Sequence, residues 1–165
     1  GIDPLVSYIE KPLMIRKGAG VSIPALPAWE DAPVVVLIDS ALPRQTGPLV
    51  RWFLESSEEP GFAAFLEKDY LPAHESMVQG WLAANADVFW SNLLRISHFQ
   101  LENFEPMVPQ TLRKTWTESF ENHDIIFKIC GAGGGGYLLG FSRTASDAHA
   151  LAEQFNIVFP FSSKV

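Results

Sequence analysis

The sequence predicts an α+β fold with a helical insertion. Short apolar runs typical of strands lie near both ends of the chain, at 33–38 and at 125–129 and 137–141. Between them, apolar residues recur in steps of three and four, which is the spacing of amphipathic helices. Strands at both ends around a helical middle indicate a sheet and a helical layer that are separate in the sequence.

The first 38 residues predict few regular elements. Residues 5–15 are mostly apolar and contain a strand-like Leu-Met-Ile at 13–15. Clustered glycines and prolines then predict a turn followed by a loop over 18–32. The Val-Val-Val-Leu-Ile run after Pro33 predicts the first buried strand.

Helices are predicted for the middle of the chain. Residues 49–54 have helical spacing, with Thr46 as a candidate N-cap, and residues 61–104 predict two or three packed helices. Pro109 is placed to open another helix. The tryptophans on these helical faces are expected to lie in the core: Trp52, Trp81, Trp90 and Trp116.

The last third returns to strands. The runs 125–129 and 137–141 flank a stretch rich in glycine. Thr144 and Asp147 then form a capping box that predicts a helix over 145–155. A short run at 157–159 predicts a last strand.

Composition narrows the function classes. The chain has 165 residues, of which 47 % are hydrophobic and 19 % charged, and its net charge of −7 argues against a nucleic-acid surface. Its longest apolar run is far shorter than the ~20 residues of a membrane helix. The single cysteine allows no internal disulfide and, with no evident signal peptide, favours a cytoplasmic protein. The four histidines share no metal-ligand spacing, so no metal site is expected in this chain.

The stretch 128–136 reads Lys-Ile-Cys-Gly-Ala-Gly-Gly-Gly-Gly. Each glycine costs about 0.5–1 kcal/mol relative to alanine in a regular element, so something must require the bare backbone. A flexible linker or hairpin tip is one interpretation, although such linkers usually carry serine. The spacing also fits a Gly-x-Gly-x-x-Gly dinucleotide fingerprint, but a strand-like run follows where that motif needs a helix. We favour a third interpretation, in which bare backbone amides press against a phosphate-bearing ligand or the loop that holds one.

Three segments resemble the GHMP kinases, the family of galactokinase, homoserine kinase, mevalonate kinase and phosphomevalonate kinase. Residues 128–136 resemble the third glycine-rich motif of that family. Residues 1–7, Gly-Ile-Asp-Pro-Leu-Val-Ser, are similar to the segment that carries the catalytic aspartate of mevalonate kinases. Residues 36–50 resemble their Val-Pro-Arg-Asn-Thr strand end and the helix after it. The order agrees, and the likeness is strong at the chain ends and weak through 55–120.

The resemblance assigns roles to individual residues. Asp3 would orient or deprotonate the substrate hydroxyl, and its structural alternative is the start of a helix. Arg44 and Thr46 would lie near the substrate. The structural alternative for Arg44 is an exposed turn residue, and the alternative for Thr46 is a helix cap. The loop beside the ATP phosphates would comprise Gly131, Ala132, Gly133, Gly134 and Gly135.

Two neighbours of the loop have plainer interpretations. Lys128 could face phosphate, but a solvated strand lysine is the favoured expectation. Cys130 has no local partner that would activate it as a nucleophile, so we expect a small buried thiol.

The resemblance implies that the chain is the C-terminal, ferredoxin-like lobe of a kinase. Such a kinase would transfer the γ-phosphate of ATP to an alcohol and would use Mg²⁺. Mevalonate is the favoured alcohol. Residues 1–32 would be a remnant of the ATP-binding lobe and residues 33–165 the C-terminal domain. The family's ATP-binding loop, catalytic lysine and magnesium ligands would lie upstream, in an N-terminal lobe that would partner this chain. The chain alone is therefore expected to be inactive. The alternatives are another GHMP kinase, acting on phosphomevalonate or a sugar, and a non-catalytic binding module; a homodimer is left open.

Overall fold

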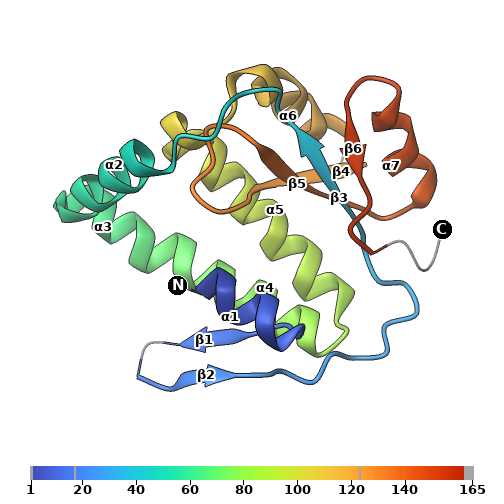
Figure 1. Ribbon diagram of the computed structural model, residues 1–165, viewed down its shortest axis with the longest axis horizontal. Helices are drawn as coiled ribbons and strands as arrows, with labels where there is room; N and C mark the ends of the chain where they lie inside the picture. Colours follow the sequence, from blue (N-terminus) through green and yellow to red (C-terminus); the bar gives the residue numbers. More distant parts are fainter. Residues whose placement is uncertain (1, 17, 123, 162–165) are drawn as a thin grey trace.

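A four-stranded antiparallel sheet lies at one side of the molecule (Figure 1). The computed structural model describes residues 2–16, 18–122 and 124–161. The sheet has the order β4-β5-β3-β6. Its strands are β3 (Val34–Asp39), β4 (Ile125–Ile129), β5 (Tyr137–Ser142) and β6 (Ile157–Val158). The predicted α+β class is confirmed, and each of these four strands was expected from its apolar run.

Helices occupy the sequence between β3 and β4, as expected. They are α2 (Thr46–Glu58), α3 (Pro60–Phe65), the π-helical turn η1 (Leu66–Tyr70), α4 (Leu71–Leu82), α5 (Ala86–Asn103), the 3₁₀ turn η2 (Glu105–Met107) and α6 (Gln110–Asn122). A last helix, α7 (Ala145–Ala152), lies between β5 and β6. The tight turn between α4 and α5 depends on Gly80, where a Cβ atom would lie 2.7 Å from the backbone nitrogen of Phe89.

Strand β4 is buried on both faces, which explains its unbroken apolar run. On one face α6 covers it, and the rings of Trp116 and Phe127 lie 6.2 Å apart. On the other face Ile126 joins a second cluster with residues of α4 and α5. The fully buried Trp116 also donates its indole N–H to Ser97 Oγ at 2.8 Å, so the polar tip of this core residue is satisfied.

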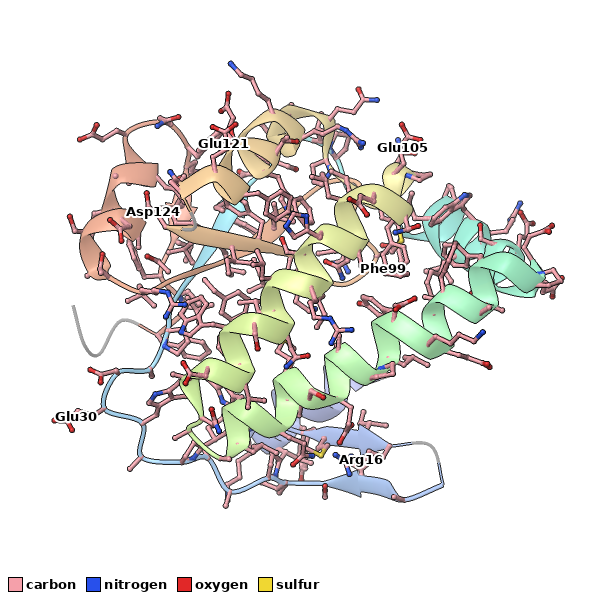
Figure 2. All side chains as sticks on the ribbon, turned by 180° about the vertical axis from the view of Figure 1, so that it is seen from behind. Arg16, Glu30, Phe99, Glu105, Glu121 and Asp124 are labelled. Atoms are coloured by element: carbon pink, nitrogen blue, oxygen red, sulfur yellow. The ribbon has the colours of Figure 1, made fainter. Side chains whose placement is uncertain are left out.

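The N-terminal residues form a unit beside α4, at the opposite end of the molecule from α6 and α7 (Figure 1). It contains helix α1 (Ile2–Ile9) and an antiparallel pair, β1 (Met14–Arg16) and β2 (Gly20–Ser22). The strand expected at 13–15 is confirmed, whereas the loop expected at 18–32 contains β2. Arg16 of β1 pairs with Glu75 of α4, which ties this unit to the helices (Figure 2).

The two predicted helix caps have different outcomes. Thr144 caps α7 as expected, because its hydroxyl accepts the Asp147 N–H at 3.1 Å, a bond between residues three apart. Thr46 does not cap α2: Gln45 is the N-cap and makes no side-chain bond there. Within the described residues, no helix combines the length and apolar character that crossing a membrane requires.

Candidate functional site

The glycine-rich loop joins β4 to β5, which pair as a hairpin. Because strand β5 follows directly, the loop lacks the helix that a dinucleotide fingerprint needs, and that alternative is wrong. The loop is also not a free linker. Gly134 N–H donates to Met107 O at 2.6 Å, and Gly136 N–H donates to Leu42 O at 2.9 Å. The loop is therefore held between the turn after β3 and the turn after α5.

Close backbone packing explains two of the loop's glycines, Gly133 and Gly135. Gly133 has a φ of +69°, and a Cβ atom there would collide with the carbonyl oxygen of Met107. At Gly135 a Cβ atom would lie 2.5 Å from Pro43 O. Our favoured interpretation placed a ligand or a phosphate-holding loop against this backbone. The structure shows instead that the chain's own carbonyl groups fill the space at these two positions.

The first part of the loop remains open to a ligand. Within the described part of the chain, the N–H groups of Gly131, Ala132 and Gly133 make no backbone hydrogen bond. Gly131 has a φ of +70°, and a Cβ atom there would lie 3.3 Å from Nη2 of Arg44. Successive amides that alternate with left-handed residues form an anion-binding concavity, and a guanidinium beside it adds positive charge. This part of the loop can bind phosphate or carboxylate oxygens.

A cavity of about 400 Å³ opens beside Gly131 and Ala132, whereas Gly133 is buried and does not line it. Thr46, Gly131 and Ala132 line it, so the structure brings three of the expected site residues together, with Arg44 next to Gly131. Gly134 lines a different hollow, of about 590 Å³, on the other side of the loop. The backbone of Asp3 lies in α1, but its side chain is outside the described part of the structure.

The cavity has an apolar wall and a polar one. The apolar residues come from α2, α5's C-terminal end, η2 and β4: Val50, Phe53, Leu54, Phe104, Met107 and Ile129. Its polar lining includes Tyr70, Gln100 and Lys128. Sequence reasoning missed Tyr70 and Gln100, because nothing in a helical polar residue indicates which cavity it lines. Phe99 of α5 packs against Tyr70 with ring centroids 5.1 Å apart (Figure 2).

Gln100 links the cavity to the edge of the sheet. Its side chain is 2 % exposed; its Nε2 donates to Tyr70 Oη at 2.9 Å, and its Oε1 accepts the Ile129 N–H at 2.8 Å. The amide thus satisfies a backbone donor of β4 that has no strand beside it. Burial raises the pKa of Tyr70, although the bond from Gln100 acts in the opposite direction.

We expect Gln100→Leu to lower the free energy of unfolding by about 1–3 kcal/mol, because a buried N–H at Ile129 loses its acceptor. Chemical denaturation measures this. Gln79→Leu is the control: Gln79 is exposed and bonds Glu75, so its change should stay within about 0.5 kcal/mol. Equal stability of the two variants would contradict the bridging role of Gln100.

Lys128 is not the solvated strand lysine that was expected. It is half-buried on β4 and lines the cavity, with Nζ donating to Ile129 O at 3.3 Å. Burial lowers the pKa of Lys128, while the neighbouring Cys130 acts to raise it. The reason for the error is that α5 and η1 cover this edge of β4, which the sequence pattern of a strand does not reveal.

Cys130 also differs from expectation, because its side chain is exposed rather than buried. It follows the last residue of β4, where the chain leaves the core. In residues 2–16, 18–122 and 124–161, no three or more histidine, cysteine or carboxylate side chains gather into a group that could hold a metal ion.

Comparison with known proteins places the fold. No protein-family model and no curated protein matches the chain. Among solved structures, the chain is similar to a Lin0012 protein from Listeria innocua, with a TM-score of 0.65 and 19 % identity over 84 % of this chain and 42 % of that one. It is similar to Streptococcus pneumoniae phosphomevalonate kinase in complex with phosphomevalonate and AMPPNP, with a TM-score of 0.60 and 16 % identity over 84 % of this chain and 40 % of that one. L. major mevalonate kinase in complex with R-mevalonate gives a TM-score of 0.60 and 13 % identity over 86 % of this chain and 43 % of that one.

The chain shares the fold of these GHMP-type kinases. The resemblance inferred from the three sequence segments is therefore confirmed at the level of the fold. The chain spans between 40 % and 43 % of the length of the three solved chains.

Proposed function

We propose that the chain is the C-terminal part of a two-lobed, ATP-dependent kinase that phosphorylates a small-molecule alcohol, with mevalonate as the favoured acceptor. The observation that carries the proposal is the pair of amides at Gly131 and Ala132, which line the same cavity as Thr46, with Arg44 beside Gly131. The shared fold with a mevalonate kinase and a phosphomevalonate kinase supports it.

Each residue has a defined role in the proposed transfer. The acceptor oxygen attacks the γ-phosphorus of ATP, the bond to the β-phosphate oxygen breaks, and ADP leaves. Asp3 holds the acceptor hydroxyl and takes its proton. The amides of Gly131 and Ala132 and the Arg44 guanidinium stabilise the negative charge on the phosphoryl oxygens. Thr46 positions the acceptor.

The loop residues fit a phosphate group, since they offer backbone donors and no obstructing side chain. ATP when bound supplies the phosphoryl group. The described residues contain no group of three or more histidine, cysteine or carboxylate side chains that could hold a metal ion. The proposal therefore assigns the magnesium ligands to the rest of the enzyme.

The N-terminal unit supports a two-lobed enzyme. Residues 1–32 are proposed as a remnant of the ATP-binding lobe, and their described part exposes several large apolar side chains: Val6, Tyr8, Ile15, Val21, Ile23 and Leu26. An exposed apolar group of this kind typically marks a surface that another protein segment covers. The proposal therefore treats the N-terminal lobe as the partner and the isolated chain as inactive.

An assay of ADP release by the full-length protein tests the function. Acceptors would include mevalonate, phosphomevalonate and a sugar, and mevalonate is expected to give the highest kcat/KM. Asp3→Asn should lower kcat by about 10²–10⁴-fold, because it removes the group that accepts the proton. Asp31→Asn, which changes an exposed aspartate of the same unit, is the control and should be neutral. If the full-length protein turns over ATP with none of these acceptors, the result would instead favour a non-catalytic binding module.

A further inference from the structure

Another hollow, of about 350 Å³, lies at the end of the β4–β5 hairpin opposite the glycine-rich loop. One wall is formed by Ile126, near the start of β4, and by Arg143, directly after β5. The other wall comes from residues of α5 that recur in steps of three and four and therefore share one helix face. These α5 residues are Asp87, Trp90, Ser91 and Leu94. None of the six lines the cavity beside Gly131, so this hollow is separate from the proposed kinase site.

Arg143 supplies a positive charge whose position is restrained. Its guanidinium carbon lies 4.5 Å from the centroid of the Trp90 ring, which is a cation–π contact. Trp90 is 6 % exposed, so the ring belongs to the core and restrains the guanidinium that lies over it. In the described part of the chain, the arginine side chains that form hydrogen bonds or ion pairs are those of Arg16 and Arg95. The N–H donors of Arg143 are therefore available to an anionic group of a ligand.

Asp87 brings the opposite charge to the same hollow. It lies in the first turn of α5, where the helix dipole favours a carboxylate. Among residues 2–16, 18–122 and 124–161, the carboxylates that accept hydrogen bonds or form ion pairs belong to Asp39, Glu75, Glu118 and Asp147. Asp87 and Arg143 thus line one hollow without pairing with each other. A ligand that carries both a cationic and an anionic group can pair with both side chains.

The rest of the hollow is mostly apolar and restricts the ligand further. Trp90 and Ile126 are 6 % and 3 % exposed, and Leu94 is half-buried, so together they can bury an apolar side chain. Ser91 Oγ donates to the Asp87 carbonyl oxygen at 2.6 Å, so its proton is used within the helix. A polyphosphate would need several cations, whereas Arg143 is the one cationic side chain among the described residues that line the hollow. A volume of about 350 Å³ suits a molecule of the size of an amino acid or a dipeptide.

We infer that this hollow binds an apolar zwitterion, either a free amino acid or a dipeptide with an aliphatic side chain. Arg143 pairs with the carboxylate of the ligand, and Asp87 pairs with its ammonium group. Trp90, Leu94 and Ile126 contact its side chain. The inference goes beyond the proposed kinase function and does not depend on it, because the hollow shares no residue with the proposed kinase site. Binding can be measured without ATP, so the two can fail separately.

Calorimetric titration of the full-length protein with five probes tests the inference. L-Leucine and L-leucyl-glycine carry both charges and an aliphatic side chain. Three further probes each lack one part: glycine lacks the side chain, isopentylamine lacks the carboxylate, and 4-methylpentanoate lacks the ammonium group. L-Leucine or L-leucyl-glycine should bind about three- to ten-fold more tightly than each incomplete probe, because the incomplete probe loses one charge pair or the buried side chain.

Two substitutions act on opposite ends of the ligand. Arg143→Met should weaken binding of the preferred probe and of 4-methylpentanoate by about three- to ten-fold, and leave isopentylamine unchanged. Asp87→Asn should weaken binding of the preferred probe and of isopentylamine, and leave 4-methylpentanoate unchanged. A folding defect would weaken all the probes together, so this crossed pattern separates ligand binding from a structural role. Arg113→Met and Asp31→Asn are the matched controls, because both residues are exposed and neither lines the hollow.

The two complete probes distinguish the two sources of such a ligand. Tighter binding of L-leucine identifies a free amino acid, and tighter binding of L-leucyl-glycine identifies a short peptide. If neither binds more tightly than the three incomplete probes, the inference is overturned. Equal affinity of Arg143→Met and Arg113→Met for the preferred probe overturns it as well. Binding that follows the crossed pattern in a protein with no ATP turnover on any alcohol would support this site and reject the kinase.

Discussion

Gly133→Ala is expected to lower the free energy of unfolding by about 2–5 kcal/mol. The left-handed backbone at φ +69° costs a residue with a Cβ roughly 1–2 kcal/mol, and the collision with Met107 O adds about 1–3 kcal/mol of overpacking. For a chain of this length, this corresponds to a fall in Tm of about 4–20 °C. Thermal and denaturant unfolding of the purified protein measure both values.

Two other glycines separate the two causes. Gly18 has a φ of +81° with no atom within 4 Å of an added Cβ, so Gly18→Ala should show the backbone cost alone. Gly135 has no positive φ but lacks space beside Pro43 O, so Gly135→Ala should show the steric cost alone. If Gly133→Ala is no more destabilising than Gly18→Ala, the close packing of the loop against Met107 does not hold in solution.

The packing of the loop also limits a simple test of the proposed function. Gly134→Ala adds one methyl group to the loop, and a loss of turnover would at first suggest that the loop holds phosphate. The structure gives Gly134 a φ of +70° and places its added Cβ against the side chain of Leu49. Loss of turnover in that variant would therefore not distinguish a kinase from a folding defect, whereas substitution of the exposed Arg44 can.

The sequence predicted features that depend on neighbouring residues. The capping bond of Thr144 joins residues three apart, and the strands and helices follow from local periodicity. The position of Gly133 against Met107 joins residues 26 apart, and Gly135 meets Pro43 across 92 residues. Composition indicates that such a loop needs bare backbone, but it cannot indicate which carbonyl approaches it.

The errors at Lys128 and Cys130 have the same origin. Both predictions assumed that a lysine prefers water and that a small thiol prefers the core. Which side of β4 is covered depends on α5 and η1, whose Gln100 and Tyr70 close over the strand edge. That arrangement is tertiary, so the residues adjacent to Lys128 in the sequence carry no signal of it.

Arg44→Met in the full-length protein is expected to lower kcat for ATP-dependent phosphorylation of the acceptor by about 10²–10³-fold. The guanidinium lies beside Gly131, where it adds positive charge to the amides that are proposed to hold the transferred phosphoryl group. Arg44 is exposed, so the free energy of unfolding should change by no more than about 0.5 kcal/mol. Steady-state kinetics at saturating ATP, with denaturation of the same samples, measure both effects.

Arg51→Met provides the matched control, because Arg51 is also an exposed arginine but lies along helix α2, away from the loop. Its kcat should remain close to that of the natural protein. Arg44→Lys keeps the charge but not the planar, bidentate donors, so its activity should fall between the two. If Arg44→Met and Arg51→Met have equal kcat, the guanidinium beside Gly131 takes no part in phosphoryl transfer. The loop amides would then have to stabilise the developing charge without a cation from this chain's Arg44.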